Sequence, residues 1–120
     1  MEEYTVQRED FDRYLDSGDA LKRLGGNKML LNTLLKKFLA DGTEGKLKSA
    51  IAEGDQEGAR AAAHTIKGLA GNLSLPALRE AAAALEAALK AGQDTGDLPQ
   101  RMYEISAKTA VVVNAVLAEG

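Results

Sequence analysis

The 120-residue chain contains no cysteine and no tryptophan, and aromatic residues make up only 4% of it. Without cysteine, disulfides, thiol nucleophiles and thiolate metal sites are excluded. No apolar run approaches the roughly 20 residues that a bilayer-spanning helix needs, and no basic segment followed by an apolar one predicts secretion. The net charge is −3 without a basic stripe, which argues against nucleic-acid binding. We therefore expect a cytoplasmic protein that binds neither membranes nor nucleic acid.

Leucine and alanine dominate the hydrophobic residues, which make up 45% of the chain. This composition favours helices over strands, because β-branched and aromatic residues are scarce before residue 105. The length is typical of one domain with one core. We predict a single, monomeric domain over residues 1–120, in which the polar residues 1–8 are flexible.

Helix-ending glycines and capping residues divide the first half of the chain. A short helix is predicted around residues 11–15, and Asp19 is expected to cap a brief helical piece that stops at residues 25–26. Asn27 is a suitable N-cap for the helix that follows. We interpret that helix as one long element reaching residue 53, with a soft or kinked middle at DGTEG, residues 41–45; two shorter helices are the alternative.

Three further amphipathic helices are predicted in the second half. Asp55 caps a helix over residues 56–73, Ser74 and Pro76 begin the next one, and Asp97 and Pro99 open the last. Apolar residues recur at helical spacing along these segments. Four such stripes with short connections predict an all-α, antiparallel, up-down-up-down four-helix bundle with a short additional N-terminal helix.

His64 is the only histidine in the chain. On a wheel of about 100° per residue, its helix has an apolar face. That face consists of Ala59, Ala62, Ala63, Ile66, Leu69, Ala70 and Leu73. His64 lies away from this face and is predicted to point toward solvent. Arg60, Lys67, Gly68 and Gly71 share its side of the helix.

This neighbourhood indicates a chemistry. A solvated imidazole is largely neutral at cytoplasmic pH, and its Nε2 is then a nucleophile. Arg60 and Lys67, one turn to either side, are expected to favour the neutral ring and to attract an anion such as a phosphoryl group. Gly68 and Gly71 would let a partner approach closely. The alternative is an incidental surface histidine, with Gly71 helping to end the helix.

Other chemistries lack the necessary residues. One histidine without cysteine is a poor transition-metal site. Thr65 points about 100° away from His64 on the wheel, so it does not form a nucleophile–base pair. No phosphate-binding glycine-rich motif is present. The chain is therefore expected to lack a nucleotide site of its own and not to be an enzyme; if His64 carries phosphate, another protein must supply it.

The segment AHTIKGLAGNL, residues 63–73, resembles the signature of histidine-containing phosphotransfer (HPt) domains of two-component phosphorelays. ALKRLGGNKMLLNTLLKKFL, AIAEGDQEGARAAAH and LREAAAALEAALKAG are similar to the segments around it, so the resemblance covers about residues 19–92. It implies a four-helix bundle in which His64 accepts phosphate through Nε2 and Lys67 neutralises the phosphoryl oxygens. Gly68, and with it Gly71, would leave room for the partner. Residues 41–45 and Ser74, where glycine is frequent, depart from the family pattern.

The resemblance also implies the partners. Response-regulator receiver domains would donate or accept the phosphoryl group on an aspartate and would bring the magnesium ion, so that this chain itself needs no metal or cofactor. A hybrid histidine kinase is a further candidate. Arg60, Lys36 and Lys37 are expected to help steer an acidic receiver. Two alternatives stay open: a non-catalytic helical adaptor, and the phosphoacceptor domain of a chemotaxis-type kinase.

Overall fold

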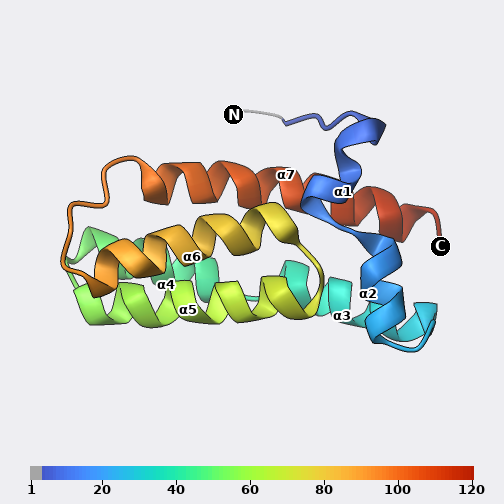
Figure 1. The fold of residues 1–120 in the computed structure, drawn as a ribbon, viewed down its shortest axis with the longest axis horizontal. Coiled ribbons are helices and arrows are strands. Elements are labelled where there is room, and N and C mark those ends of the chain that lie inside the picture. The colour runs from blue at the N-terminus through green and yellow to red at the C-terminus, as the bar shows by residue number, and fades with distance from the viewer. Residues whose placement is uncertain (1–3) are drawn as a thin grey trace.

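The computed structural model describes residues 4–120, and its regular elements within that range are all helical (Figure 1). They are η1 (Arg8–Asp10), α1 (Phe11–Tyr14), α2 (Ser17–Arg23), α3 (Lys28–Ala40), α4 (Thr43–Ala52), α5 (Gln56–Asn72), α6 (Pro76–Lys90) and α7 (Leu98–Ala118). The predicted all-α class is confirmed. In the described part of the chain, no helix has both the length and the apolar character needed to cross a bilayer. Residues 1–3, part of the segment predicted to be flexible, lie outside the described residues.

The helices form an antiparallel bundle in which α3 and α4 follow one another as its first arm (Figure 1). α4 packs on α5, α5 on α6 and α6 on α7, and α3 contacts α7 to complete the bundle. The chain reverses direction from the first arm to α5, again to α6, and again to α7. The short helices η1, α1 and α2 lie at the end where α7 finishes.

The predicted long helix from residue 28 to residue 53 is wrong, because the chain breaks between α3 and α4. Asp41 adopts extended backbone angles, φ −68° and ψ 132°, and Gly42 precedes the first turn of α4. The Thr43 hydroxyl donates to the two carboxylate oxygens of Asp41 at 2.9 and 2.8 Å. This local side-chain pairing favours a turn over a continuous helix. Gly45, the other glycine of the segment, lies within α4.

Side-chain caps fix the starts of α2, α3 and α5. Asn27 accepts from the backbone N–H of Leu30 at 3.0 Å, and Asp55 accepts from Gly58 at 2.9 Å, which confirms both predicted N-caps. The prediction for Asp19 is wrong: Asp16 is the N-cap of α2 and accepts from the Asp19 N–H at 3.1 Å. Asp19 lies in the first turn of α2, where its carboxylate is free to bond elsewhere.

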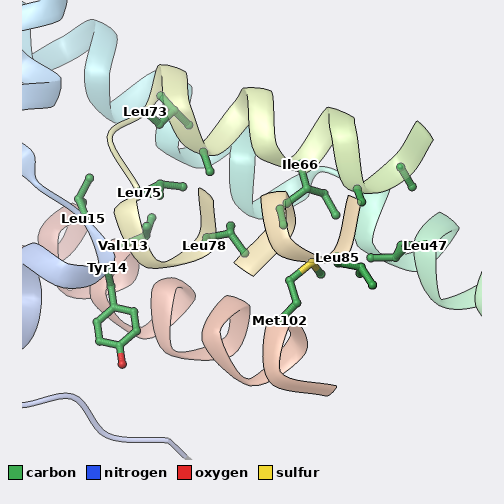
Figure 2. Close-up of a cluster of buried hydrophobic side chains, with 14 of the residues drawn as sticks. Tyr14, Leu15, Leu47, Ile66, Leu73, Leu75, Leu78, Leu85, Met102 and Val113 are labelled. Carbon is green, nitrogen blue, oxygen red and sulfur yellow. The ribbon is translucent and has the colours of Figure 1, made fainter. Parts of the chain in front are cut away.

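The core fixes the rotation of α5. Leu47, Ile66, Leu85 and Met102, from four successive helices, converge in the centre of the bundle (Figure 2). Full burial of a side chain of this size contributes about 1.5–3 kcal/mol. Rotating α5 about its axis would expose Ile66 and its buried alanine neighbours, so the opposite face of α5 is held toward solvent.

Candidate functional site

His64 lies on α5, on the side opposite the buried residues. Ala59, Ala62, Ala63, Ile66, Ala70 and Leu73 are buried, and Leu69 is partly buried. His64 is two residues from Ile66 and therefore points about 160° away from it. Its side chain is 62% exposed. The structure thus places the imidazole outward, as the wheel predicted.

Glu86 of α6, which the sequence analysis missed, is the direct partner of this imidazole. Its Oε2 lies 2.8 Å from Nδ1 of His64, and its Oε1 lies 2.7 Å from Nζ of Lys67. Only 12% of the Glu86 side chain is exposed. A signal was present in the sequence: Glu86 lies about 40° from Ala82 on the α6 wheel, within the apolar stripe. A carboxylate at a core-facing position calls for a partner.

The contact with Glu86 determines which nitrogen of the ring is available. An ionised carboxylate only accepts hydrogen bonds, so Nδ1 must carry the proton when it bonds to Glu86. In the neutral ring, Nε2 then holds the free lone pair, because the bond at one nitrogen fixes the tautomer at the other. The exposed imidazole therefore offers Nε2 as its nucleophilic atom.

Glu86 is held in its ionised form by its neighbours. The hydrogen bond from Lys67, and after it the hydrogen bond from His64, lower the pKa of Glu86 below its ordinary value, although burial acts in the opposite direction. The electrostatics therefore differ from the expected pair of flanking cations. The nearest charge to the ring is the Glu86 carboxylate, which also holds Lys67.

Arg60 is engaged chiefly with another carboxylate. Its Nε and Nη2 donate to Glu57 at 3.0 and 2.6 Å, while Nη1 lies 3.9 Å from Oε2 of Glu86. Both contacts keep the guanidinium on the same side of α5 as His64. Glu57 already neutralises much of its charge, so Arg60 acts on the ring more weakly than an unpaired cation would.

Gly68 and Gly71 differ in their surroundings. A Cβ built on Gly68 would meet nothing within 4 Å, so this position opens directly to solvent beside the imidazole. A Cβ on Gly71 would lie 3.4 Å from Nε and 3.5 Å from Cδ of Arg79. A Cβ at residue 71 would thus be in van der Waals contact with a side chain of α6, whereas residue 68 faces open space.

The remaining candidates are placed as follows. Lys37 lines a groove between α3 and α5, together with Leu69 and Leu73, whereas Lys36 is exposed outside it. Thr65 donates its hydroxyl to the backbone carbonyl of Ala61 at 3.1 Å and makes no bond to the imidazole. Within residues 4–120, no group of three or more side chains is arranged to hold a metal ion.

The comparison with family models assigns the chain to a family. The model described as the Hpt domain matches residues 33–115, which is most of the sequence. Comparisons with curated proteins and with solved structures gave no significant match. The chain belongs to the Hpt domain family, whose members act in histidine phosphotransfer within two-component systems. Such domains are phosphocarriers that interact with receiver domains and histidine kinases.

Proposed function

We propose that Nε2 of His64 accepts a phosphoryl group from the aspartate of a receiver domain, and that His64 then passes this group to another receiver. The observation that carries this proposal is the hydrogen bond of 2.8 Å between Nδ1 of His64 and Glu86, combined with an imidazole that is 62% exposed. One nitrogen is held by the protein and the other is left for a visiting molecule. An incidental surface histidine would not need a buried carboxylate behind it.

The proposed step balances as a simple displacement. The Nε2 lone pair forms a bond to phosphorus, and the bond between phosphorus and the aspartate oxygen breaks. The receiver keeps the electron pair as an aspartate carboxylate, and no proton leaves the imidazole. The ring becomes a phosphorylated imidazolium, whose positive charge lies against Glu86. Phosphoryl transfer of this kind depends mainly on positioning and charge stabilisation.

Lys67 is suited to stabilise the transferred group. Its ammonium has three N–H donors, and one is used by Glu86 at 2.7 Å. The remaining donors are available to phosphoryl oxygens beside the neighbouring imidazole, one turn away on the same face of α5. Glu86 therefore orders both groups, because each of its carboxylate oxygens holds one of them.

The partner in this proposal is a response-regulator receiver domain, with a hybrid histidine kinase as a further candidate. The open space at Gly68 supports close approach of a partner loop to the ring. The magnesium ion would be bound by the receiver, and this chain would need no cofactor of its own. The nucleotide would likewise be used elsewhere, so the chain would serve as a carrier.

The direct test is label transfer from phosphorylated receiver domains to the wild-type chain and to His64→Gln. We expect the wild type to gain phosphate that is labile in acid and stable in base, and His64→Gln to gain none. Labelling of His64→Gln would refute the assignment. A chain that binds receivers without becoming labelled would instead be an adaptor. A chain labelled by a kinase ATP-binding domain, but by no receiver, would be a chemotaxis-type phosphoacceptor.

A further inference from the structure

A second groove lies on α5 beyond the imidazole, toward the α5–α6 turn. Its volume is about 510 Å³, and its lining includes Lys67, Gly68 and Gly71 from α5, Arg79 from α6 and Arg23 from α2. Gly71 is seven residues from His64, which places it about 10 Å along the helix and about 20° around it. The groove therefore continues the face that carries His64.

The cations of this groove are not equivalent. Lys67 is paired with Glu86 at 2.7 Å, and Arg23 is paired with Asp19 at 2.9 Å. Arg79 takes part in none of the ion pairs found within residues 4–120. It is exposed, and its Nε and Cδ would lie 3.4 and 3.5 Å from a Cβ at residue 71. Its side chain thus lies against α5 at residue 71 and forms no ion pair there, although Asp16 and Asp19 also line this groove.

We propose that Arg79 is a partner-recognition residue, which pairs with a carboxylate on the receiver domain that docks over His64. A protein–protein interface of ordinary size covers about 800 Å² on each partner, equivalent to a disc of roughly 16 Å radius. Such a footprint centred on the imidazole includes Gly71 and the guanidinium on it. Arginine suits this role because its planar fork binds a carboxylate with two parallel hydrogen bonds.

Gly71 acquires a role through this arrangement. A Cβ at residue 71 would still fit beside Arg79, whereas a longer side chain there would compete with Arg79 for this face of α5. The guanidinium is then presented within the face that the receiver covers. This differs from Gly68, where the space remains open to the partner itself.

The inference rests on the proposed function and is tested with a receiver domain that transfers phosphate to the wild-type chain. The variants are Arg79→Glu, Arg79→Lys and the control Arg101→Glu, an exposed arginine on α7, which packs on α6. We expect Arg79→Glu to lower kcat/KM for transfer at least tenfold through KM, with little change at saturating receiver. Arg79→Lys should fall between it and the wild type, and Arg101→Glu should stay within twofold.

Salt screens the attraction between Arg79 and a receiver carboxylate, and Arg79→Glu lacks that attraction. A weaker dependence of kcat/KM on ionic strength in this variant than in the wild type would therefore support the ion pair. Folding is checked by helical circular dichroism and thermal unfolding. A new acidic residue in the first turn of α6 suits the helix dipole, so a folded variant is expected. Equal values of kcat/KM for Arg79→Glu and Arg101→Glu would overturn this inference while leaving the role of His64 intact. Failure of the wild type to become labelled would instead remove the proposed function, and this inference with it.

Discussion

Glu86 and Asp19 have the same kind of neighbours at two different places in the bundle. Glu86 accepts from the His64 ring at 2.8 Å and pairs with Lys67 at 2.7 Å. Asp19 accepts from the Ser74 hydroxyl at 2.6 Å and pairs with Arg23 at 2.9 Å. Each carboxylate thus lies between an uncharged donor and a cation, and each joins segments that are distant in the sequence.

The Glu86 network (with His64 and Lys67) and the Asp19 network (with Ser74 and Arg23) differ in the exposure of the uncharged donor. The Ser74 residue is buried at the α5–α6 turn, where its backbone carbonyl also accepts from the N–H of Asp16. That network ties α2 to the turn. His64 instead keeps a second nitrogen on the outside of the bundle. A carboxylate with two partners therefore stabilises the fold at Asp19, whereas at Glu86, under the proposed function, it orients a nucleophile.

Replacement of Glu86 by alanine should have the largest effect on phosphotransfer, and so distinguish the Glu86 network from the Asp19 network. The His64 ring would lose the acceptor that selects its tautomer and balances the imidazolium formed on phosphorylation. Hydrogen bonds to charged groups are worth about 1.5–3 kcal/mol, equivalent to roughly 10–100-fold in rate. We expect single-turnover transfer from a phosphorylated receiver to slow by that factor in Glu86→Ala.

Two further variants control this measurement. Glu86→Gln keeps an oxygen that can accept from Nδ1, so it should be slowed less than Glu86→Ala. Glu80→Ala removes an exposed carboxylate from the same helix and should transfer normally. A transfer rate in Glu86→Ala equal to that in Glu80→Ala would show that Glu86 is only a structural partner, like Asp19.

Gly68 sharpens the comparison because it tests access to the exposed nitrogen without touching either network. Gly68→Ala should stabilise α5 by up to about 1 kcal/mol, since an added Cβ meets nothing within 4 Å. Gly68→Gln fills the same space with a larger side chain and should lower kcat/KM for transfer about tenfold, because hot-spot losses of 1–2 kcal/mol are common in interfaces. Thermal unfolding and transfer assays measure the two effects separately. Unimpaired transfer by Gly68→Gln would mean that partners do not approach along this side of α5.

Much of this arrangement follows from local sequence. The apolar spacing around Ile66 predicted which face of α5 is buried, and therefore where His64 points. Asn27 and Asp55 were predicted as N-caps because the capping bond spans only three residues. Such features need no knowledge of the rest of the fold, and they came out correctly.

The errors arose where two segments must be placed relative to one another or where several side chains compete. Glu86 meets His64 only once α6 is docked on α5 in a particular rotation, so a wheel of α5 alone could not reveal it. At the start of α2, Asp16 and Asp19 are both of a residue type that caps helices, but only Asp16 is the N-cap, while Asp19 accepts from the distant Ser74. At Asp41, the hydrogen bonds from the Thr43 hydroxyl favour a turn, although the apolar spacing on both sides predicted a continuous helix.

Ser74 offers a way to weaken the second network while leaving the first intact. Its φ of 57° lies in the left-handed region that favours glycine, which costs other residues about 1–2 kcal/mol. Ser74→Gly and Ser74→Ala both lose the hydroxyl that donates a hydrogen bond to Asp19. Only glycine also removes the strain of a positive φ at this position. We expect Ser74→Gly to be more stable than Ser74→Ala by about 1–2 kcal/mol in thermal or denaturant unfolding. Transfer well below the melting temperature should be the same in both, and a rate as low as that of Glu86→Ala would contradict a purely structural role.

The pH dependence of stability is the smallest expected effect, and it tests what the two networks share. Folding lowers the pKa of Glu86 from an ordinary value of 4.5, chiefly through Lys67, and that of Asp19 from 3.8, chiefly through Ser74. Stability from such a group is fully present above the unfolded pKa and is lost as the pH falls through the lower, folded pKa. We therefore expect the melting temperature to fall as the pH is lowered below about 4.5.

Glu86→Gln should show a smaller fall than the wild type over this range, because the substituted amide does not titrate. Asp19→Asn should behave in the same direction at slightly lower pH, in line with its lower ordinary value. Glu80→Gln, which removes the same charge without breaking an ion pair, should follow the wild-type curve. If Glu86→Gln also followed it, the ionised carboxylate would not be bound more tightly in the folded chain, and the pairing of Glu86 with Lys67 and His64 would contribute no net stabilisation.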